Sequence, residues 1–252
     1  MDDRRERFEA ACRAAAERER GVGIGTLGEK TLHAVLKRYI EPDESFHEVP
    51  VGSYFADIFR EGHIYEIQTG SFTPLRPKLE LLLDYTDVTV IYPMAAVKYL
   101  SWTDPATGEV TEPRRSPKKA RPIESVYELI KIKYTLDNPR FHLKLIMLEL
   151  HEMRLRDGRR SRDGKRGSHR CDRVPVRIID EIDINCPEDF DIFIPRGLEG
   201  SFTIKEFAKA AGVTYDCAQR AVNILTYLER LLPCGKRGRE NLYTLPPSGG
   251  RL

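Results

Sequence analysis

Residues 54–68, YFADIFREGHIYEIQ, hold the clearest structural pattern in this chain. Aromatic and β-branched residues are concentrated in Tyr54–Phe59 and again in His63–Thr69, which is typical of β-strands. Glu61-Gly62 between them favours a tight turn, because glycine adopts the positive φ angles that hairpin turns need. The pattern therefore predicts a β-hairpin.

The segments on either side of this hairpin complete an α/β pattern. Before it, apolar residues recur at helical spacing over residues 26–40, and a further strand is predicted over Phe46–Val51. After it, a leucine-rich helix is predicted over Thr73–Tyr85. A short strand, Val88–Tyr92, follows and is expected to end at Pro93. The order helix, three strands, helix, strand predicts an α/β fold with a mixed central sheet flanked by helices.

The composition excludes several classes of protein. The chain has 252 residues, and its 41 Lys and Arg residues nearly balance 39 Asp and Glu residues, for a net charge of +2. No apolar run approaches the roughly 20 residues that span a membrane, and the N-terminus lacks the apolar stretch of a signal peptide. A cytoplasmic protein with no membrane partner is therefore expected. Five cysteines without CxxC spacing argue against both a disulfide framework and a zinc site.

The chain is expected to contain three parts. Residues 1–20 predict a charged helix whose thin apolar face suits a short docking helix at best. Residues 21–195 are assigned to the α/β domain, in which a second hairpin flanks the Asp104–Gly108 turn. Phe141–Leu155 in this domain is compatible with either a strand or a helix. Residues 200–246 are assigned to a separate small domain.

The C-terminal part has the pattern of a winged helix. Thr203, with Glu206 three residues later, predicts the capped start of a helix, and Gly212 predicts the turn after it. The next helix has an apolar stripe at helical spacing, formed by Ala218, Ala221, Val222, Leu225 and Leu228. A hairpin around Gly238 ends the domain. A helix–turn–helix followed by a hairpin is a winged helix, a module that binds DNA in some proteins and other proteins elsewhere.

Two acidic side chains of the first hairpin are candidates for chemistry. If its strands pair antiparallel, Asp57 comes nearly opposite Glu66, and Gln68 shares the face of Glu66. Carboxylates that are close together and shielded from water repel each other unless a cation neutralises them. Mg²⁺ or Mn²⁺ suits such oxygen ligands, and activates water for attack on a phosphodiester. The alternative is a solvated cross-strand pair at a sheet edge.

With these residues in this element order, residues 24–93 resemble the PD-(D/E)XK nuclease superfamily, which has the restriction-endonuclease-like fold. The resemblance implies that Asp57 and Glu66 bind a metal and that Gln68 takes the position usually held by lysine. It also implies that Glu29 matches the acidic residue often found on the first helix; alternatively, Glu29 only caps that helix. The implied catalytic set is Asp57, Glu66, Gln68 and Glu29, with the metal on Asp57, Glu66 and Glu29.

Gln68 departs from the family pattern. A neutral amide does not transfer a proton and stabilises negative charge less than lysine does, although some restriction endonucleases of this fold have glutamine there. Arg76 or Lys78, on the helix that follows, would supply the missing positive charge, unless that helix face is only solvated. His33, one turn after Glu29, is either an auxiliary contact to substrate or a structural histidine.

Three basic clusters are candidates for contact with DNA phosphates. The first follows the second hairpin and includes Arg121, the second is the loop over residues 154–170, and the third is the C-terminal hairpin. On the helix before that hairpin, Gln219 would read adenine and Arg220 guanine. The predicted DNA-binding residues are Arg114, Arg115, Lys118, Lys119, Gln219, Arg220, Lys236, Arg237 and Arg239. A solvated loop is the alternative for each cluster.

We therefore expect a DNA endonuclease that hydrolyses phosphodiester bonds with Mg²⁺ or Mn²⁺ and is targeted by a winged helix. The alternative is a non-catalytic DNA-binding protein or regulator with a degenerate nuclease fold, which Gln68 favours. A protein-binding scaffold is least supported, because it leaves the basic loops without a role. DNA is the expected partner, and a homodimer is left open.

Overall fold

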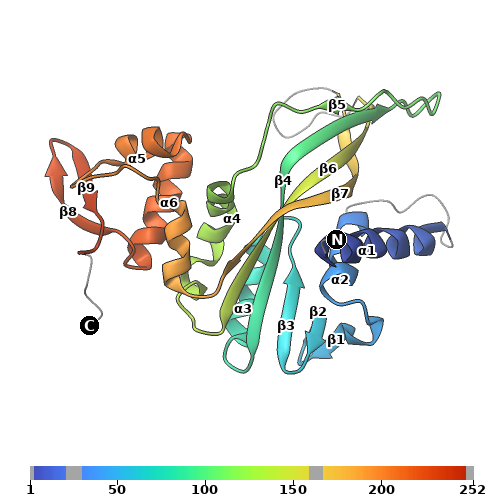
Figure 1. Ribbon diagram of the computed structural model, residues 1–252, viewed down its shortest axis with the longest axis horizontal. Helices are drawn as coiled ribbons and strands as arrows, with labels where there is room; N and C mark the ends of the chain where they lie inside the picture. The colour runs from blue at the N-terminus through green and yellow to red at the C-terminus, as the bar shows by residue number, and fades with distance from the viewer. Residues whose placement is uncertain (1–2, 21–29, 159–166, 248–252) are drawn as a thin grey trace. The chain divides into compact units, whose positions relative to one another are not determined.

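A computed structural model describes residues 3–20, 30–158 and 167–247 of the chain (Figure 1). The strands are β1 (His47–Val51), β2 (Tyr54–Arg60), β3 (His63–Ile67), β4 (Asp87–Thr103), β5 (Arg114–Arg115), β6 (Phe141–Leu155), β7 (His169–Ile184), β8 (Leu232–Arg237) and β9 (Glu240–Thr244). The α-helices are α1 (Asp3–Arg20), α2 (Lys30–Ile40), α3 (Arg76–Leu82), α4 (Val126–Leu129), α5 (Ile204–Ala211) and α6 (Tyr215–Tyr227). Among these helices, none combines the length and the apolar character that crossing a membrane requires.

The predicted fold class is confirmed. A mixed sheet of seven strands has the order β1-β2-β3-β4-β6-β7, with β5 paired to β4, and helices flank it. The elements α2, β1, β2, β3, α3 and β4 follow one another in the expected order. β2 pairs antiparallel with β1 and with β3. Figure 1 shows β3 and β4 running in the same direction, as strands joined through a helical crossover do.

The strand that was predicted to end at Pro93 continues to Thr103 as β4. The carbonyl of Ile91 accepts a hydrogen bond from the backbone N–H of Gln68, 2.9 Å away. Alternate residues of a strand direct their backbone groups to the same neighbour, so the nitrogen of Pro93 also faces the β3 side. β3 ends at Ile67, and the proline therefore removes only the next bond of a ladder that is already ending. β4 continues because its pairing with β6 lies on the other side.

Two later segments form β-structure. The hairpin predicted around Asp104–Gly108 is present, with an antiparallel bridge between Thr103 and Val110. Phe141–Leu155, which the sequence left between strand and helix, is strand β6. Polar residues interrupt its apolar ones without a helical period, yet Leu143, Leu145 and several neighbours are fully buried. A strand buried on both faces gives such a run without a clean alternation.

The described chain forms two compact units. Unit 1 comprises Met1–Thr69, Val90–Ala120 and Lys144–Ile182. Unit 2 comprises Gly70–Thr89, Arg121–Leu143 and Asp183–Leu252. Besides the C-terminal segment over residues 200–246, unit 2 thus includes segments from the region 21–195.

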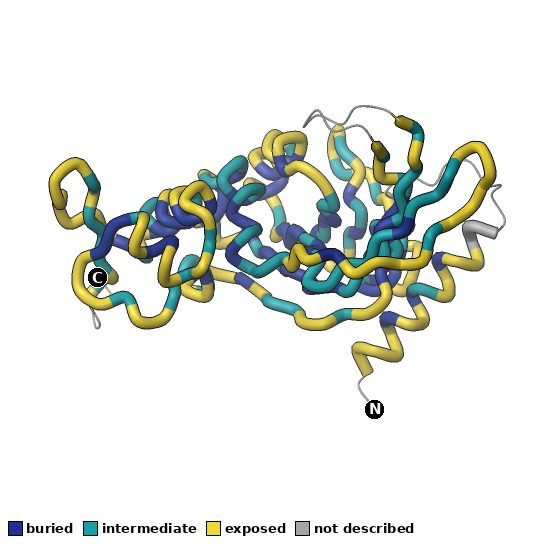
Figure 2. The backbone as a smooth tube through the Cα atoms, turned by 90° about the horizontal axis from the view of Figure 1, so that it is seen from above, coloured by how far each residue is buried: buried dark blue, intermediate teal, exposed yellow. Residues whose placement is uncertain are grey.

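Helices α1 and α2 pack on the sheet of unit 1. Buried side chains of both helices form one core with residues of β2, β3, β4 and β6, among them Leu36, Ile58 and Ile146. Phe8 of α1 meets the ring of Tyr39 of α2 edge-on, with centroids 5.7 Å apart. Figure 2 shows buried positions recurring along one side of an otherwise exposed α1. The charged helix predicted over residues 1–20 is present as α1, in which Ala, Arg and Glu sustain 18 helical residues around this narrow apolar side.

The C-terminal elements of unit 2 have the predicted order of helix, turn, helix and hairpin. Thr203 and Glu206 form the predicted capping box of α5, with bonds of 3.2 and 2.7 Å. Gly212 ends α5 with a φ of 61°, a conformation that glycine adopts without strain. Phe202 and Tyr243 exchange two backbone hydrogen bonds of 2.8 Å, which attach the hairpin β8–β9 to the start of α5. β8 is exposed along its whole length (Figure 2).

Candidate functional site

Asp57 and Glu66 lie side by side in unit 1, as the hairpin predicted. β2 and β3 pair regularly up to Ile58 and Tyr65, one residue before the acidic pair. Beyond that point, the backbone N–H of Asp57 donates to Glu66 Oε1 (3.3 Å), and the N–H of Ile67 donates to Asp57 Oδ2 (2.8 Å). Each carboxylate therefore accepts a hydrogen bond from the opposite strand. Glu66 is buried, and the Asp57 side chain is 17% exposed.

Helix α2 brings two basic side chains to Asp57. His33 Nε2 lies 3.1 Å from Asp57 Oδ2, and Lys37 Nζ lies 3.8 Å from Asp57 Oδ1. His33 and Lys37 are one turn apart and therefore share a face of the helix. The Lys37 ammonium also pairs with Glu48 of β1, and its side chain is only 9% exposed. Asp57 thus stands between a strand backbone and two basic groups.

These contacts determine the ionisation of Asp57. Burial raises the pKa of this carboxyl group, but the hydrogen bond and charge of His33, the N–H of Ile67 and the charge of Lys37 together outweigh that effect. The pKa of Asp57 consequently lies below its ordinary value of 3.8. At neutral pH, Asp57 is an ionised carboxylate available as an oxygen ligand.

The donor chemistry of the pair fits a hard divalent cation. Asp57 Oδ2 accepts two hydrogen bonds, whereas Oδ1 accepts none from the described residues. Mg²⁺ commonly takes one or two protein carboxylates and keeps several waters, so Asp57 and Glu66 suffice as its protein ligands. Glu29, the third predicted ligand, lies outside the described residues. In the described ranges, no cluster of three or more His, Cys, Asp or Glu side chains is arranged to hold a metal ion.

The other residues predicted around the acidic pair fall in different places. Gln68 directly follows β3, is partly buried, and donates its backbone N–H to Ile91. Arg76 and Lys78 belong to unit 2, and Arg76 pairs with Glu80 at 2.8 Å. Besides His33, the structure places Lys37 beside Asp57, and sequence reasoning missed this lysine. The signal was its position four residues after His33, on the face already under consideration.

The first basic cluster is divided between exposed residues and one structural arginine. Arg114 and Arg115 form β5 and are exposed, as are Lys118 and Lys119. Arg121 belongs to unit 2, where its guanidinium donates to the carbonyls of Ala211 and Gly212 at the end of α5 (2.9 and 2.8 Å). Arg121 therefore caps a helix. In the second cluster, Arg154 pairs with Glu152 at 2.6 Å, and residues 159–166 lie outside the described part of the chain.

Some of the basic residues predicted on α6 and the hairpin form ion pairs with acidic side chains, and others are exposed. Arg220 pairs with Asp216 at 3.1 Å and lies over the ring of Tyr127. Arg237 pairs with Glu206 at 2.7 Å. Lys236 and Arg239 are exposed on the hairpin.

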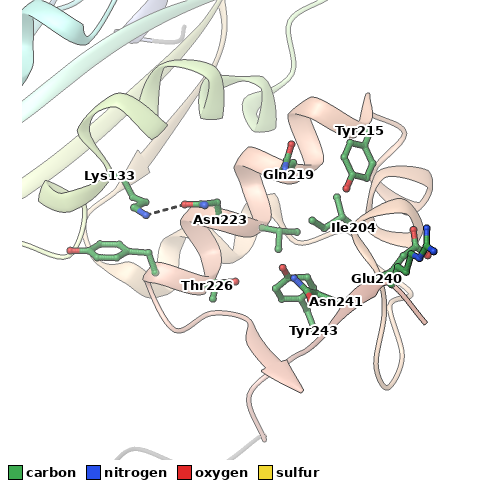
Figure 3. A pocket seen from close by; sticks show the side chains of 12 residues that line it. Lys133, Ile204, Tyr215, Gln219, Asn223, Thr226, Glu240, Asn241 and Tyr243 are labelled. Carbon is green, nitrogen blue, oxygen red and sulfur yellow. Dashed lines mark hydrogen bonds between the residues drawn. The ribbon is translucent and has the colours of Figure 1, made fainter. Parts of the chain in front are cut away.

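Gln219 and Arg239 line one hollow of about 520 Å³ between α6, the start of α5 and the hairpin (Figure 3). The predicted base-reading residue Gln219 thus faces a concave surface that includes Tyr215 and Asn241. A hollow accepts a group that protrudes from its partner, which a convex helix surface does not.

The segment that contains the acidic pair matches a known protein family. Residues 30–185 match the family described as "Domain of unknown function (DUF8091)". The chain belongs to the DUF8091 family. The DUF8091 match runs from α2 to β7 and includes His33, Lys37, Asp57 and Glu66, but it ends before α5, α6 and the hairpin.

A relative shows that similarity extends beyond the DUF8091 region. An uncharacterized protein from Treponema pallidum (strain Nichols) is 28% identical over 239 residues, which cover 90% of this chain and 89% of that protein. Coverage of this extent must reach past residue 185. No solved structure matches the chain.

Proposed function

We propose that this chain is a metal-dependent deoxyribonuclease that hydrolyses phosphodiester bonds in DNA. The observation that carries the proposal is the pairing of Asp57 with Glu66 at the end of the β2–β3 hairpin. This pair stands in the α–β–β–β–α–β order that is expected of the PD-(D/E)XK superfamily. An ionised Asp57 beside the buried carboxyl group of Glu66 offers oxygen ligands to a divalent cation.

The residues of the site would have two roles, to bind the metal ion and to neutralise negative charge. Asp57 and Glu66 would hold Mg²⁺ or Mn²⁺, which when bound lowers the pKa of a water and stabilises charge on the phosphate under attack. His33 and the Ile67 N–H fix Asp57 through Oδ2, which leaves Oδ1 for the cation. Lys37 supplies a positive charge beside Oδ1, where Gln68 has none to offer. The amide of Gln68 orients water or phosphate by hydrogen bonding.

Exposed basic residues support DNA as the substrate. Arg and Lys neutralise phosphates and release counterions, so the affinity is expected to fall steeply with salt. The residues that are exposed and suited to this role are Arg114, Arg115, Lys118, Lys119, Lys236 and Arg239. The proposal keeps the cytoplasmic location expected from the sequence and leaves a homodimer open.

A second candidate function is a DNA-binding protein that does not cleave. Gln68 in place of lysine favours it, and so do the contacts of Asp57 with His33 Nε2 and Lys37 Nζ, which offer this carboxylate partners within the protein. In this case the acidic cluster would stabilise the hairpin against α2, while the basic residues would still bind DNA.

Cleavage assays with two isosteric variants separate these functions. Supercoiled plasmid, linear duplex and single-stranded DNA are incubated with wild type, Asp57→Asn and Glu66→Gln in Mg²⁺ or Mn²⁺. The nuclease proposal expects cleavage by wild type and a loss of about 100-fold or more in both variants. Asp87→Asn, at an exposed position, is the matched control and should cleave like wild type. DNA binding without cleavage on every substrate would support the second function and reject the first.

A further inference from the structure

The hollow in unit 2 is lined mainly by polar side chains of α6, together with Val222 (Figure 3). Tyr215, Gln219, Asn223 and Thr226 follow one another at three- and four-residue intervals, so they project from one side of the helix. Asn241 and Tyr243 of β9 line the opposite side. The volume of about 520 Å³ lies within the range of about 300–1,000 Å³ that is usual for small-molecule sites. Polar side chains on this face are not needed to pack the core, so another role is expected for them.

Hydrogen-bonding groups in the hollow are left available for a ligand. Lys133 Nζ donates to Asn223 Oδ1 at 3.0 Å, which orients the amide and leaves its NH₂ group to donate into the hollow. The Thr226 hydroxyl oxygen is buried and has no hydrogen-bond partner among the described residues. This hydroxyl lies below the surface of the hollow, so the groups that a ligand can reach are the exposed amides. Gln219 and Asn241 add two exposed amides.

The charge around the hollow favours an anion. Its acidic residue, Glu240, is already paired with Lys205 at 2.7 Å. Lys133 lies over the rings of Tyr134 and Tyr227, at 4.8 and 5.3 Å from their centroids, and has no acidic partner among the described residues. Arg239 is exposed at the rim. Two positive charges therefore remain for a phosphate group.

An exposed aromatic ring completes the chemistry of a base site. Tyr215 is 50% exposed, although it lines the hollow. Tyrosine rings stack on nucleobases of every kind, because each base has a flat π face. Side-chain amides bond to the donor and acceptor pattern along a base edge.

We propose that this hollow binds one unpaired nucleotide, with its base stacked on Tyr215, its edge bonded to the exposed amides of Asn223 and Asn241, and its phosphate held by Arg239. The inference rests on the proposed function only in taking DNA as the natural source of that nucleotide. A base in a duplex cannot enter, because its edge is paired and its faces are stacked. Unit 2 would thus select single-stranded or frayed DNA, a substrate class that the acidic pair in unit 1 does not define.

Binding measurements without metal test the proposal separately from cleavage. Fluorescence anisotropy in EDTA follows a labelled single strand and a blunt duplex of the same length, and free dAMP and dTMP serve as competitors. We expect Tyr215→Ala to weaken single-strand binding about tenfold and Tyr215→Phe to keep it, because the phenyl ring still stacks. Asn223→Ala and Arg239→Ala should each weaken it several-fold. Duplex binding by Tyr215→Ala and Asn223→Ala should change less than twofold.

Asn241→Ala distinguishes a ligand contact from a structural role. The substitution removes an exposed amide, so it should weaken single-strand binding several-fold while leaving the stability of the protein unchanged. Tyr85→Ala and Arg196→Ala are matched controls at exposed positions of unit 2 and should bind like wild type. Competition by a free mononucleotide that is lost in Tyr215→Ala would identify a free nucleotide as the ligand; competition by the strand alone would identify DNA.

The proposal is overturned if wild type binds neither single strand nor mononucleotide, or if Tyr215→Ala, Asn223→Ala and Asn241→Ala all bind them like wild type. Asp57→Asn is measured alongside and should bind the single strand normally. Loss of cleavage in Asp57→Asn with normal binding in the hollow variants would reject this inference and keep the nuclease. The reverse result would reject the nuclease and keep the nucleotide site.

Discussion

Lys37 Nζ lies 3.8 Å from Asp57 Oδ1, and the lysine side chain is 9% exposed. Lys37 Nζ also pairs with Glu48 of β1. Removal of one partner from such a cluster leaves an uncompensated charge. Under the proposed nuclease function, Lys37 would supply the positive charge that Gln68 does not.

Lys37→Met is expected to reduce DNA cleavage by about 100-fold, because a preorganised positive charge beside the phosphate is lost. Gln68→Lys in the same chain should restore part of this activity, since it adds a positive charge at the end of β3 near the acidic pair. Rates of plasmid nicking in Mg²⁺ measure both effects. Lys209→Met, at an exposed position of α5, serves as the control. Wild-type cleavage by Lys37→Met would remove Lys37 from the mechanism.

Replacement of His33 is expected to raise the pKa of Asp57. In the wild type, burial raises this pKa, but His33, the Ile67 N–H and Lys37 together hold it below 3.8. Because the folded pKa is lowered, the stability from ionised Asp57 is present above the unfolded pKa and is lost as the pH falls through the folded pKa. In His33→Ala, this contribution should be smaller, and its loss should be complete at a higher pH. Carbon-13 NMR of the Asp57 carboxyl group follows the titration directly, with His169→Ala as the control; identical Asp57 titrations in wild type and His33→Ala would contradict the prediction.

The sequence was sufficient for features determined by neighbouring residues. Glu61-Gly62 fixes the register of the first hairpin, and that register alone brings Asp57 beside Glu66. Lys37 was missed because its proximity to Asp57 depends on how α2 is rotated on the sheet. The burial of Leu32 and Leu36 determines that rotation, which is a property of tertiary packing.

Pairing between distant segments also could not be read from the chain. The role of Pro93 depends on where β3 ends, and β3 ends many residues earlier in the sequence. Arg121 looked like a phosphate contact because its neighbours in sequence are basic. Its carbonyl partners, Ala211 and Gly212, lie 90 and 91 residues away along the chain. A run of basic residues in the sequence shows only where charge is concentrated. The contacts in the folded protein decide which of these charges remain available to bind DNA.

Glu152→Gln is expected to lower the free energy of unfolding by about 1–3 kcal/mol near neutral pH. Glu152 is buried on β6 between Lys98, at 3.3 Å, and Arg154, at 2.6 Å. Burial raises the pKa of Glu152, but both basic neighbours outweigh it, so the pKa lies below 4.5. The contribution is therefore complete above the unfolded pKa and is lost as the pH falls through the folded pKa.

Urea unfolding of wild type and Glu152→Gln over a range of pH tests this prediction. The difference in stability should be constant near neutral pH and should shrink as the solution becomes more acidic than the ordinary carboxyl pKa of 4.5. Glu109→Gln, at an exposed position, is the control and should change stability by less than about 0.5 kcal/mol. A difference between wild type and Glu152→Gln that does not depend on pH would show that the charge of Glu152 is not responsible.

Arg121→Ala is expected to destabilise unit 2 and to leave DNA binding by the folded protein unchanged. Its guanidinium donates to two carbonyls at the C-terminal end of α5, where the helix dipole favours a cation. Loss of these charge-assisted bonds should lower the free energy of unfolding by about 1–3 kcal/mol. Lys119→Ala, two residues earlier and exposed, should show the opposite pattern, with unchanged stability and weaker, less salt-dependent DNA binding. Urea unfolding and anisotropy titrations of both variants measure the contrast. Equal effects of the two substitutions on DNA affinity would return Arg121 to the phosphate-binding cluster.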